Sequence, residues 1–143
     1  MKSNIKIAFI CTGNTCRSPM AQFIFRQKLK EAGLVGVEVY SFGLNVTEQK
    51  MNDNAVKALR VLNVKRTKFT PKQLKKPEIY DALITMTKEQ KKYINSSDVY
   101  SISELTGIGD IGDPYGCDLQ KYVEVATQID NACGEIIKLL RRL

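Results

Sequence analysis

The apolar positions along the chain fall into short apolar-rich runs separated by stretches with a helical period. The first run, residues 5–10, is nearly continuous, as expected of a strand in a parallel sheet that is covered on both faces. Further runs at 37–40, 82–86 and 99–102 predict three more strands. The pattern therefore indicates four strands in all.

Helical periods follow the first two strands. Ser18 is a candidate N-cap with Pro19 at the first helical position, and Gly33 ends the helix that follows. Asn52 or Asp53 can cap the second helix. Each helix carries one apolar face. The two faces consist of Met20, Phe23, Ile24 and Leu29, and of Ala55, Val56, Leu59 and Leu62.

The second half of the chain ends in a long amphipathic helix. Before it, Pro71 opens a short helix that Pro77 limits, residues 88–94 form another helix, and the glycine-spotted stretch 107–116 is a loop. From Leu119 onward, apolar residues recur every three or four positions. They are Tyr122, Val125, Ala126, Ile129, Ala132, Cys133, Ile136, Ile137 and Leu140. The alternation of strands and helices predicts one α/β domain over residues 1–143, a small open four-stranded parallel sheet with helices on both faces.

The composition limits the possible catalytic mechanisms, because the 143 residues include no histidine. This excludes Ser-His-Asp and Cys-His pairs, a histidine-ligated catalytic zinc and a phosphohistidine relay. The apolar run at 7–10 is too short for a signal peptide or a membrane span. We therefore expect a cytoplasmic protein with reduced cysteines and no membrane contact.

The chain is basic, with 22 Lys and Arg against 15 Asp and Glu and a formal charge of +7. Such a field attracts acidic partners. The basic residues are scattered, without interleaved aromatic residues or a nucleic-acid-binding motif, so we interpret them as a solvated surface and expect no nucleic acid partner. Phosphorylated substrates would benefit from the same field.

Candidate chemistry lies in the turn between the first strand and the first helix, the place where open α/β sheets bind ligands. The turn reads Cys11-Thr-Gly-Asn-Thr-Cys-Arg17-Ser18. Its backbone N–H groups can converge on a dianion near a helix N-terminus, and Gly13 and Asn14 tolerate a positive φ in such a nest. Arg17 adds a planar fork for two phosphate oxygens. We predict a phosphate cradle made of Thr12, Gly13, Asn14, Thr15, Cys16, Arg17 and Ser18.

Cys11 lies at the base of this cradle, where the same positive field favours its thiolate, so it is the candidate nucleophile. The alternative interpretation is a buried strand-end cysteine that behaves as a small hydrophobe. Ser18 is placed to donate to the thiolate, and Asn14 to lock the loop by side-chain hydrogen bonds. Cys16 is either filler or a redox partner that traps oxidised Cys11 as a disulfide.

Protonation of a leaving group requires an acid, which in the absence of histidine is sought among carboxylates. Asp113 precedes Pro114 and Tyr115 in the loop before the terminal helix. An aspartate placed there could act over the cradle or could simply form the turn. The remaining cysteines, Cys117 and Cys133, are interpreted as structural.

These motifs resemble the low-molecular-weight protein tyrosine phosphatase family along essentially the whole chain. The resemblance rests on the signature loop from Cys11 to Arg17, Ser-x-Gly at 41–43, Asp-x-Leu-Ile-x-Met-Thr at 81–87, and Asp-Pro-Tyr at 113–115. It implies the Rossmann-like, phosphotyrosine protein phosphatase I-like fold. It also implies a protein tyrosine phosphatase that needs no metal or cofactor and acts on phosphorylated proteins as a monomer or weak dimer.

The resemblance also implies roles for individual residues. Cys11 would attack phosphorus and form a cysteinyl-phosphate intermediate, while Arg17 and the loop amides hold the transition state. Asp113 would protonate the leaving group and then activate water, with Ser18 stabilising the departing thiolate. Tyr115 would line the mouth of the substrate pocket.

The sequence departs from the family pattern at three places. Thr15 stands where an aliphatic residue is usual and resembles the protein arginine phosphatase branch, so phosphoarginine is an alternative substrate. Leu44 begins a segment that lacks the aromatic residue common after Ser-x-Gly, and we assign Thr15, Leu44 and Tyr115 to the substrate pocket. The histidine that many members use behind the loop is missing, so that hydrogen-bond network must be rebuilt or weaker.

Two other classes of protein remain as hypotheses. A phosphate-binding module without turnover would use the cradle but not Asp113. A thiol redox enzyme like the related arsenate reductases would need a second cysteine near the third strand, where Thr85, Met86 and Thr87 stand. This absence disfavours arsenate reduction unless Cys117 serves instead.

Overall fold

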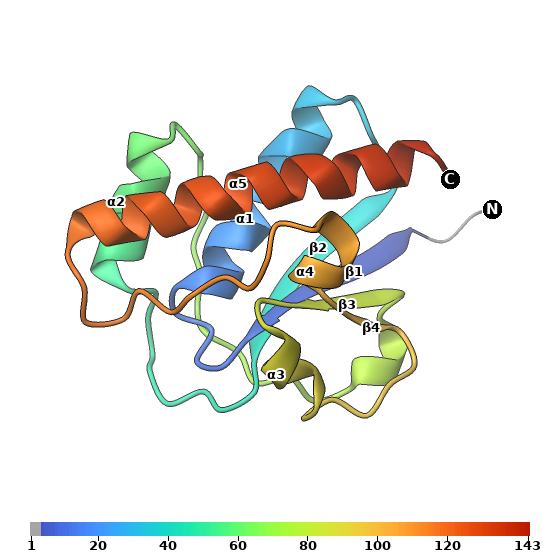
Figure 1. The fold of residues 1–143 in the computed structure, drawn as a ribbon, viewed down its shortest axis with the longest axis horizontal. Helices are drawn as coiled ribbons and strands as arrows, with labels where there is room; N and C mark the ends of the chain where they lie inside the picture. Colours follow the sequence, from blue (N-terminus) through green and yellow to red (C-terminus); the bar gives the residue numbers. More distant parts are fainter. Residues whose placement is uncertain (1–3) are drawn as a thin grey trace.

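Four parallel strands form the central sheet of residues 4–143, the part of the chain that the computed structural model describes (Figure 1). The strands are β1 (Ile5–Cys11), β2 (Val37–Gly43), β3 (Ala82–Thr85) and β4 (Val99–Ser101). Their spatial order is β2-β1-β3-β4, and every pairing is parallel. This confirms the predicted four-stranded α/β architecture.

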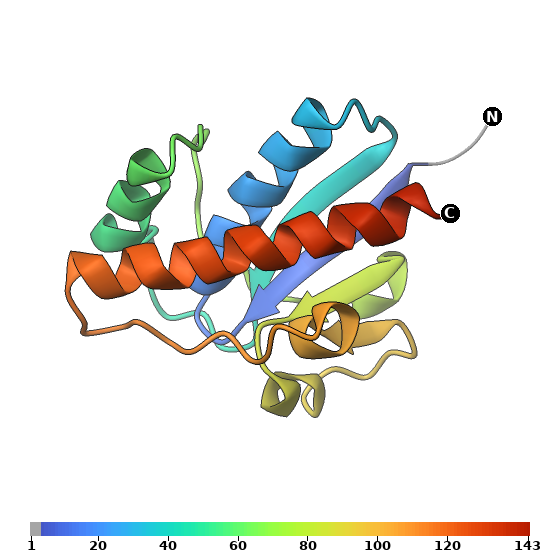
Figure 2. The ribbon, with the colours of Figure 1, turned by 45° about the horizontal axis from the view of Figure 1, so that its top comes forward.

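Helices of unequal size cover the two faces of the sheet. The helices are α1 (Arg17–Glu31), α2 (Asp53–Val61), α3 (Lys88–Lys91), α4 (Ile102–Thr106), α5 (Leu119–Arg141) and the 3-10 helix η1 (Pro77–Ile79). Figures 1 and 2 show α5 running across α1 and α2 on one side of the sheet. The main core lies between these helices and β1, and it includes Phe9, Phe25 and Tyr122.

The opposite face is covered more lightly. A smaller core there contains Ala8, Ile10, Leu83 and Ile94, the last of which follows α3 in the sequence. An aromatic group of Tyr40, Phe42 and Tyr80 packs against it.

The helix α5 confirms the amphipathic period read from the sequence, because its predicted apolar positions from Tyr122 to Ile137 are buried. The cap of α2 is also as predicted. The Asn52 side chain accepts hydrogen bonds from the backbone N–H groups of Asn54 at 2.8 Å and Ala55 at 3.3 Å. None of the helices between residues 4 and 143 combines the length and apolar character that a membrane span requires.

The predicted start of α1 is wrong by two residues. The N-cap position is Cys16, which makes no side-chain cap, and the helix begins at Arg17. Ser18 lies inside the first turn and is fully buried, with its hydroxyl directed at Cys11. The Ser18 hydroxyl thus contacts Cys11 inside the loop and does not cap α1.

The short helix predicted after Pro71 is absent between residues 65 and 76, which run as an extended segment. This segment pairs with the end of β2, because the Gly43 N–H donates to the Lys72 carbonyl at 2.8 Å and the Leu74 N–H to the Gly43 carbonyl at 2.9 Å. Sheet-like pairing therefore replaces helical hydrogen bonds there, and the proline that begins a helix is Pro77 of η1.

Element boundaries in the second half of the chain also differ from the prediction, and one helix was not predicted. The helix predicted over 88–94 ends at Lys91, and β4 ends at Ser101. There the Ser101 side chain and Glu104 form a capping box that starts α4, which the sequence analysis missed. Reading Ile102 as the end of a strand concealed this helix start.

Candidate active site

The signature loop is held by hydrogen bonds to its carbonyls, which leaves its amides available to a ligand. The Cys11 and Thr12 carbonyls accept from the N–H groups of Leu44 at 3.0 Å and Asn45 at 2.8 Å, and the Thr15 carbonyl accepts from Asn52 at 3.0 Å. No backbone N–H from residue 12 to residue 17 donates to an acceptor within residues 4–143. These amides and the N-terminus of α1 leave a positive, hydrogen-bond-donating hollow, as a phosphate group requires.

Asn14 provides the positive φ on which the nest depends. Its φ is 56°, whereas Gly13 does not adopt a positive φ, so one of the two residues predicted for this conformation takes it. Asn14 is fully buried. Asparagine tolerates this backbone conformation because its short polar side chain can hydrogen-bond locally.

The Asn14 side chain makes three hydrogen bonds behind the loop. Its Nδ2 group donates to the Ser18 hydroxyl at 2.8 Å and to the Ser41 hydroxyl at 3.1 Å. Its Oδ1 accepts from the Lys72 backbone N–H at 2.9 Å, and Ser41 donates in turn to Gln22. A backbone amide and a glutamine side chain therefore complete the hydrogen-bond network behind the loop.

Close packing of Gly43 against the loop completes this support. Gly43 lies beside Cys11 in the β1–β2 register. A Cβ atom on Gly43 would lie 2.8 Å from the Thr12 carbonyl oxygen and 2.6 Å from Val46 Cγ2. Only glycine allows β2 to approach the loop this closely.

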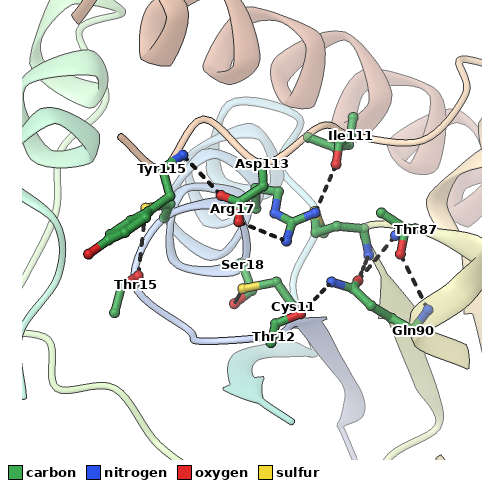
Figure 3. Close-up of polar contacts among 12 residues, drawn as sticks. Cys11, Thr12, Thr15, Arg17, Ser18, Thr87, Gln90, Ile111, Asp113 and Tyr115 are labelled. Atoms are coloured by element: carbon green, nitrogen blue, oxygen red, sulfur yellow. Dashed lines mark hydrogen bonds and ion pairs between the residues drawn. The ribbon is translucent and has the colours of Figure 1, made fainter. Parts of the chain in front are cut away.

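Cys11 and Ser18 are in direct contact at the floor of the loop. The Cys11 Sγ lies 2.9 Å from the Ser18 Oγ (Figure 3). Asn14 donates to the Ser18 oxygen, so the serine proton is left for one of two acceptors, the Cys11 sulfur at 2.9 Å or the Phe42 carbonyl at 3.5 Å. The shorter contact places Ser18 where it can donate to a thiolate, and this role stays a prediction.

Arg17 is buried and held from two sides. It is 6% exposed, its Nη1 donates to the Ile111 carbonyl at 2.9 Å, and its Nη2 lies 3.8 Å from Asp113 Oδ2 (Figure 3). The loop that contains Asp113 thus meets the signature loop through this guanidinium. The contact with the Ile111 carbonyl could not be predicted from the sequence, because every residue has a backbone carbonyl.

The contacts of Asp113 are compatible with both predicted roles, a residue that forms the turn and an acid beside the signature loop. Its Oδ1 accepts from the Tyr115 N–H at 3.1 Å, which is a turn-forming contact, while its Oδ2 faces Arg17. Asp113 and Tyr115 remain exposed to solvent. The carboxylate is therefore positioned by the turn and stays accessible to a ligand in the loop.

A cavity of about 310 Å³, here called the loop cavity, contains most of the predicted pocket residues. Cys11, Arg17, Asp113, Thr15 and Tyr115 line it. Leu44 instead lines a neighbouring cavity of about 720 Å³. Asn45, Thr47 and Glu48, which the sequence analysis did not name, complete the wall of the loop cavity.

Gln90 is a further residue that the sequence analysis missed. It is buried, its Oε1 accepts from the N–H groups of Met86 at 2.9 Å and Thr87 at 3.1 Å, and its Nε2 donates to the Thr12 hydroxyl at 3.3 Å. The pattern Thr87-x-x-Gln90 is a capping box, so a signal for the helix start was present in the sequence. The contact with Thr12 had no such signal.

The four cysteines are free thiols in different surroundings. Cys16 is buried, with its Sγ 3.6 Å from the Thr15 hydroxyl and 3.7 Å from the Tyr122 hydroxyl, and burial raises the pKa of its thiol. Cys133 lies in the main core, whereas Cys117 is exposed. The disulfide between Cys11 and Cys16 stays a prediction.

Comparison with known proteins agrees with this geometry. The sequence model of a family described as low molecular weight phosphotyrosine protein phosphatase matches residues 6–143. The chain belongs to this phosphatase family. A protein-arginine-phosphatase of Bacillus subtilis is 32% identical to it over 95% of this chain and 97% of its own length.

Relatives named for tyrosine phosphatase activity are similar to the chain at a comparable level. The low molecular weight protein-tyrosine-phosphatase PtpB of Staphylococcus haemolyticus is 30% identical over 92% of this chain and 97% of its own length. Among solved phosphatase structures, a YwlE mutant from Bacillus subtilis superimposes with a TM-score of 0.89 at 30% identity, covering 96% of this chain and 99% of its own. The family is thus established, and its two named specificities are both represented among these relatives.

Proposed function

We propose that this chain is a metal-independent protein phosphatase that hydrolyses phosphotyrosine through a cysteinyl-phosphate intermediate. The observation that carries the proposal is the set of loop amides without an acceptor beside Cys11, joined by the buried Arg17 that lines the same cavity. A phosphoryl group bound there has its phosphorus above the Cys11 sulfur, which lies 2.9 Å from the Ser18 hydroxyl oxygen. Binding alone therefore brings nucleophile and target together.

In the first step, the Cys11 thiolate attacks phosphorus opposite the leaving oxygen. The sulfur–phosphorus bond forms as the phosphorus–oxygen bond to the tyrosine breaks. Arg17 and the loop amides stabilise the charge on the three equatorial oxygens. Asp113 gives its proton to the leaving phenolate oxygen, and its place on the exposed edge of the loop cavity supports this role.

In the second step, water replaces the sulfur. Asp113, now a carboxylate, takes a proton from the attacking water, and the new phosphorus–oxygen bond forms as the sulfur–phosphorus bond breaks. Ser18 donates to the departing thiolate. Inorganic phosphate and the original carboxylic acid are regenerated, so the cycle needs no external reductant or metal.

Phosphoarginine is the second candidate substrate, and Thr15 favours it. Thr15 lines the loop cavity together with Tyr115, and its hydroxyl contacts the Cys16 sulfur. The hydroxyl makes this part of the cavity polar, which suits a phosphoguanidinium group better than a flat phenol ring. The similarity to a protein-arginine-phosphatase supports the same alternative.

The proposal is tested by comparing phosphotyrosine and phosphoarginine peptides in the presence of EDTA. Hydrolysis by the unmodified protein and its loss in Cys11→Ser are expected. Thr15→Ile should shift the ratio of the two kcat/KM values toward phosphotyrosine. An unchanged ratio would remove Thr15 from the specificity argument, and activity that survives Cys11→Ser would refute the nucleophile.

The same experiment separates the two other classes of function. A phosphate-binding module would bind the peptides without releasing phosphate, and its binding would not depend on Asp113. A thiol redox enzyme would turn over only with a reductant and a second cysteine. Phosphate release without reductant supports the phosphatase over both.

We further propose that phosphorylated proteins are the partners and that the protein works in the cytoplasm. A nucleophilic thiol must stay reduced, which the cytoplasm provides. Cell fractionation with an antibody tests the location, and sedimentation tests the expected monomer or weak dimer.

A further inference from the structure

Three cavities adjoin one another, beginning at the signature loop. The loop cavity shares Thr12, Arg17 and Asn45 with the cavity of about 720 Å³, here called the middle cavity. The middle cavity shares Gln73 with a third one of about 530 Å³, here called the lysine cavity. The three adjoining cavities are here together called the depression.

The middle cavity has a largely apolar wall. Leu44, Leu74, Pro77 and Ile94 line it, and three of these residues also pack in or against the smaller core. Polar residues line it as well, both those shared with the loop cavity and others such as Gln73, Glu89 and Asn95. An apolar side chain placed here would be removed from water against an ordered surface.

The lysine cavity is basic and has an aromatic floor. Lys72, Lys75 and Lys76 line it, and no acidic residue does. None of these three lysines pairs with a carboxylate within residues 4–143. The rings of Phe42 and Tyr80, 5.3 Å apart, form the floor. This cavity therefore suits an acidic side chain.

The wall between the middle and lysine cavities is fixed by hydrogen bonds. Gln73 Nε2 donates to the Leu44 carbonyl at 2.7 Å, and Gln73 Oε1 accepts from the Val46 N–H at 3.0 Å. The Leu74 N–H donates to the Gly43 carbonyl at 2.9 Å. The depression is therefore formed before a ligand arrives, and binding does not have to order it.

We infer that the three cavities form a track for the substrate polypeptide. This inference rests on the proposed phosphatase function. The phosphorylated side chain occupies the loop cavity, a nearby apolar side chain occupies the middle cavity, and an acidic side chain further along reaches the lysine cavity. A polynucleotide fits less well, because it would place charge on the apolar middle cavity.

Phosphopeptides on an alanine-glycine background test this track. Leucine is placed one to three residues from the phosphorylated residue and glutamate three to six residues away, on either side. The peptide with both is expected to have a kcat/KM at least about tenfold above the unsubstituted peptide in one chain direction. Equal kcat/KM values for all peptides would overturn the track.

Two matched double variants separate local contact from overall charge. Lys75→Gln/Lys76→Gln should lose about fivefold on the glutamate peptide and nothing on the unsubstituted peptide or a small aryl phosphate. Arg141→Gln/Arg142→Gln removes the same charge from the far end of α5 and should leave the glutamate preference intact. Equal losses in both variants would assign the preference to the general field and overturn the track.

Binding distinguishes failure of the track from failure of the phosphatase function. Fluorescence anisotropy with the Cys11→Ser protein ranks the peptides by affinity whether or not the natural protein turns them over. The same ranking as for kcat/KM is expected. If the peptides differ in affinity but the unmodified protein hydrolyses none of them, the phosphatase function is refuted and the track is supported. If the protein hydrolyses the peptides but binds them all equally, the track is refuted and the phosphatase function is supported.

Discussion

The sulfur of Cys11 and the hydroxyl oxygen of Ser18 lie 2.9 Å apart, seven residues apart in sequence and on opposite sides of the turn that joins β1 to α1. The contact exists because Ser18 is inside the helix and not at its cap. It connects the sulfur to Asn14 and, through Asn14, to Ser41 and Lys72.

Replacing Ser18 by alanine should lower kcat by about 100-fold, because the departing thiolate loses its hydrogen-bond donor. The KM for an aryl phosphate should change little, since the loop amides and Arg17 remain. Steady-state kinetics with an aryl phosphate measures both constants. Ser97→Ala on the exposed surface is the control, and equal kcat values for the two variants would contradict the role of Ser18.

Replacing Asp113 by asparagine should affect substrates in proportion to how poor their leaving groups are. Aryl phosphates with strongly basic leaving groups should slow by about 100-fold or more, and those with weakly basic leaving groups by less than about tenfold. A series of substituted phenyl phosphates gives the dependence. The same loss along the whole series would rule out Asp113 as the acid.

Replacing Gly43 by alanine should reduce the free energy of unfolding by about 2 to 3 kcal/mol, because its Cβ atom would overlap the Thr12 carbonyl. Gly134→Ala in α5 meets no atom within 4 Å and should instead stabilise by about 0.5 to 1 kcal/mol. Urea unfolding of both variants measures the difference. If Gly43→Ala is as stable as the parent, the close approach of β2 to the loop is not as described.

Alkaline pH should destabilise the fold through its buried thiols. Burial raises the pKa of the Cys133 thiol, and likewise that of Cys16. The unfolded chain therefore loses these protons first, so stability is complete below about pH 8.5 and falls above it, by about 1.4 kcal/mol per pH unit for Cys133. Urea unfolding with reductant at pH 7 to 10 measures this slope.

The matched variants for that experiment are Cys133→Ala and Cys117→Ala. Cys133→Ala should be less stable at pH 7 because it leaves a small cavity, but its stability should decline less steeply with pH. Cys117→Ala should keep the slope of the parent, because that side chain is exposed. Identical slopes in all three proteins would show that the Cys133 thiol does not contribute.

Oxidation tests the predicted role of Cys16. Hydrogen peroxide should inactivate the parent reversibly, with dithiothreitol restoring activity, if Cys16 traps oxidised Cys11 as a disulfide. Cys16→Ser should be inactivated irreversibly under the same treatment. Full recovery of Cys16→Ser would leave Cys16 as filler beside Tyr122.

Local sequence patterns predicted the main strands and helices and the position of the signature loop. The apolar run before Cys11 predicted β1, and the period from Tyr122 to Ile137 predicted α5, because each of these elements is defined by its own side chains. Cys11, Arg17 and Ser18 follow from their place after β1. Asp113 was a candidate acid from its chemistry and its loop, and its role came from the resemblance to the phosphatase family and stays a prediction.

Contacts between distant segments had no comparable signal. The Lys72 amide that supports Asn14 comes from 58 residues away, and Gln90 reaches Thr12 across 78 residues. The pairing of Gln73 with Gly43 turned a predicted helix into an extended segment. Each depends on how the strands are arranged in space, which residue types alone do not specify.

The fixed shape of the signature loop affects how the site responds to free phosphate. The loop is held in shape by Leu44, Asn45 and Asn52 before any ligand binds, so it does not distinguish the phosphate of a substrate from free phosphate. Inorganic phosphate should therefore compete with substrate and raise the melting temperature as its concentration increases. The same rigidity that favours catalysis makes the enzyme sensitive to the phosphate level around it.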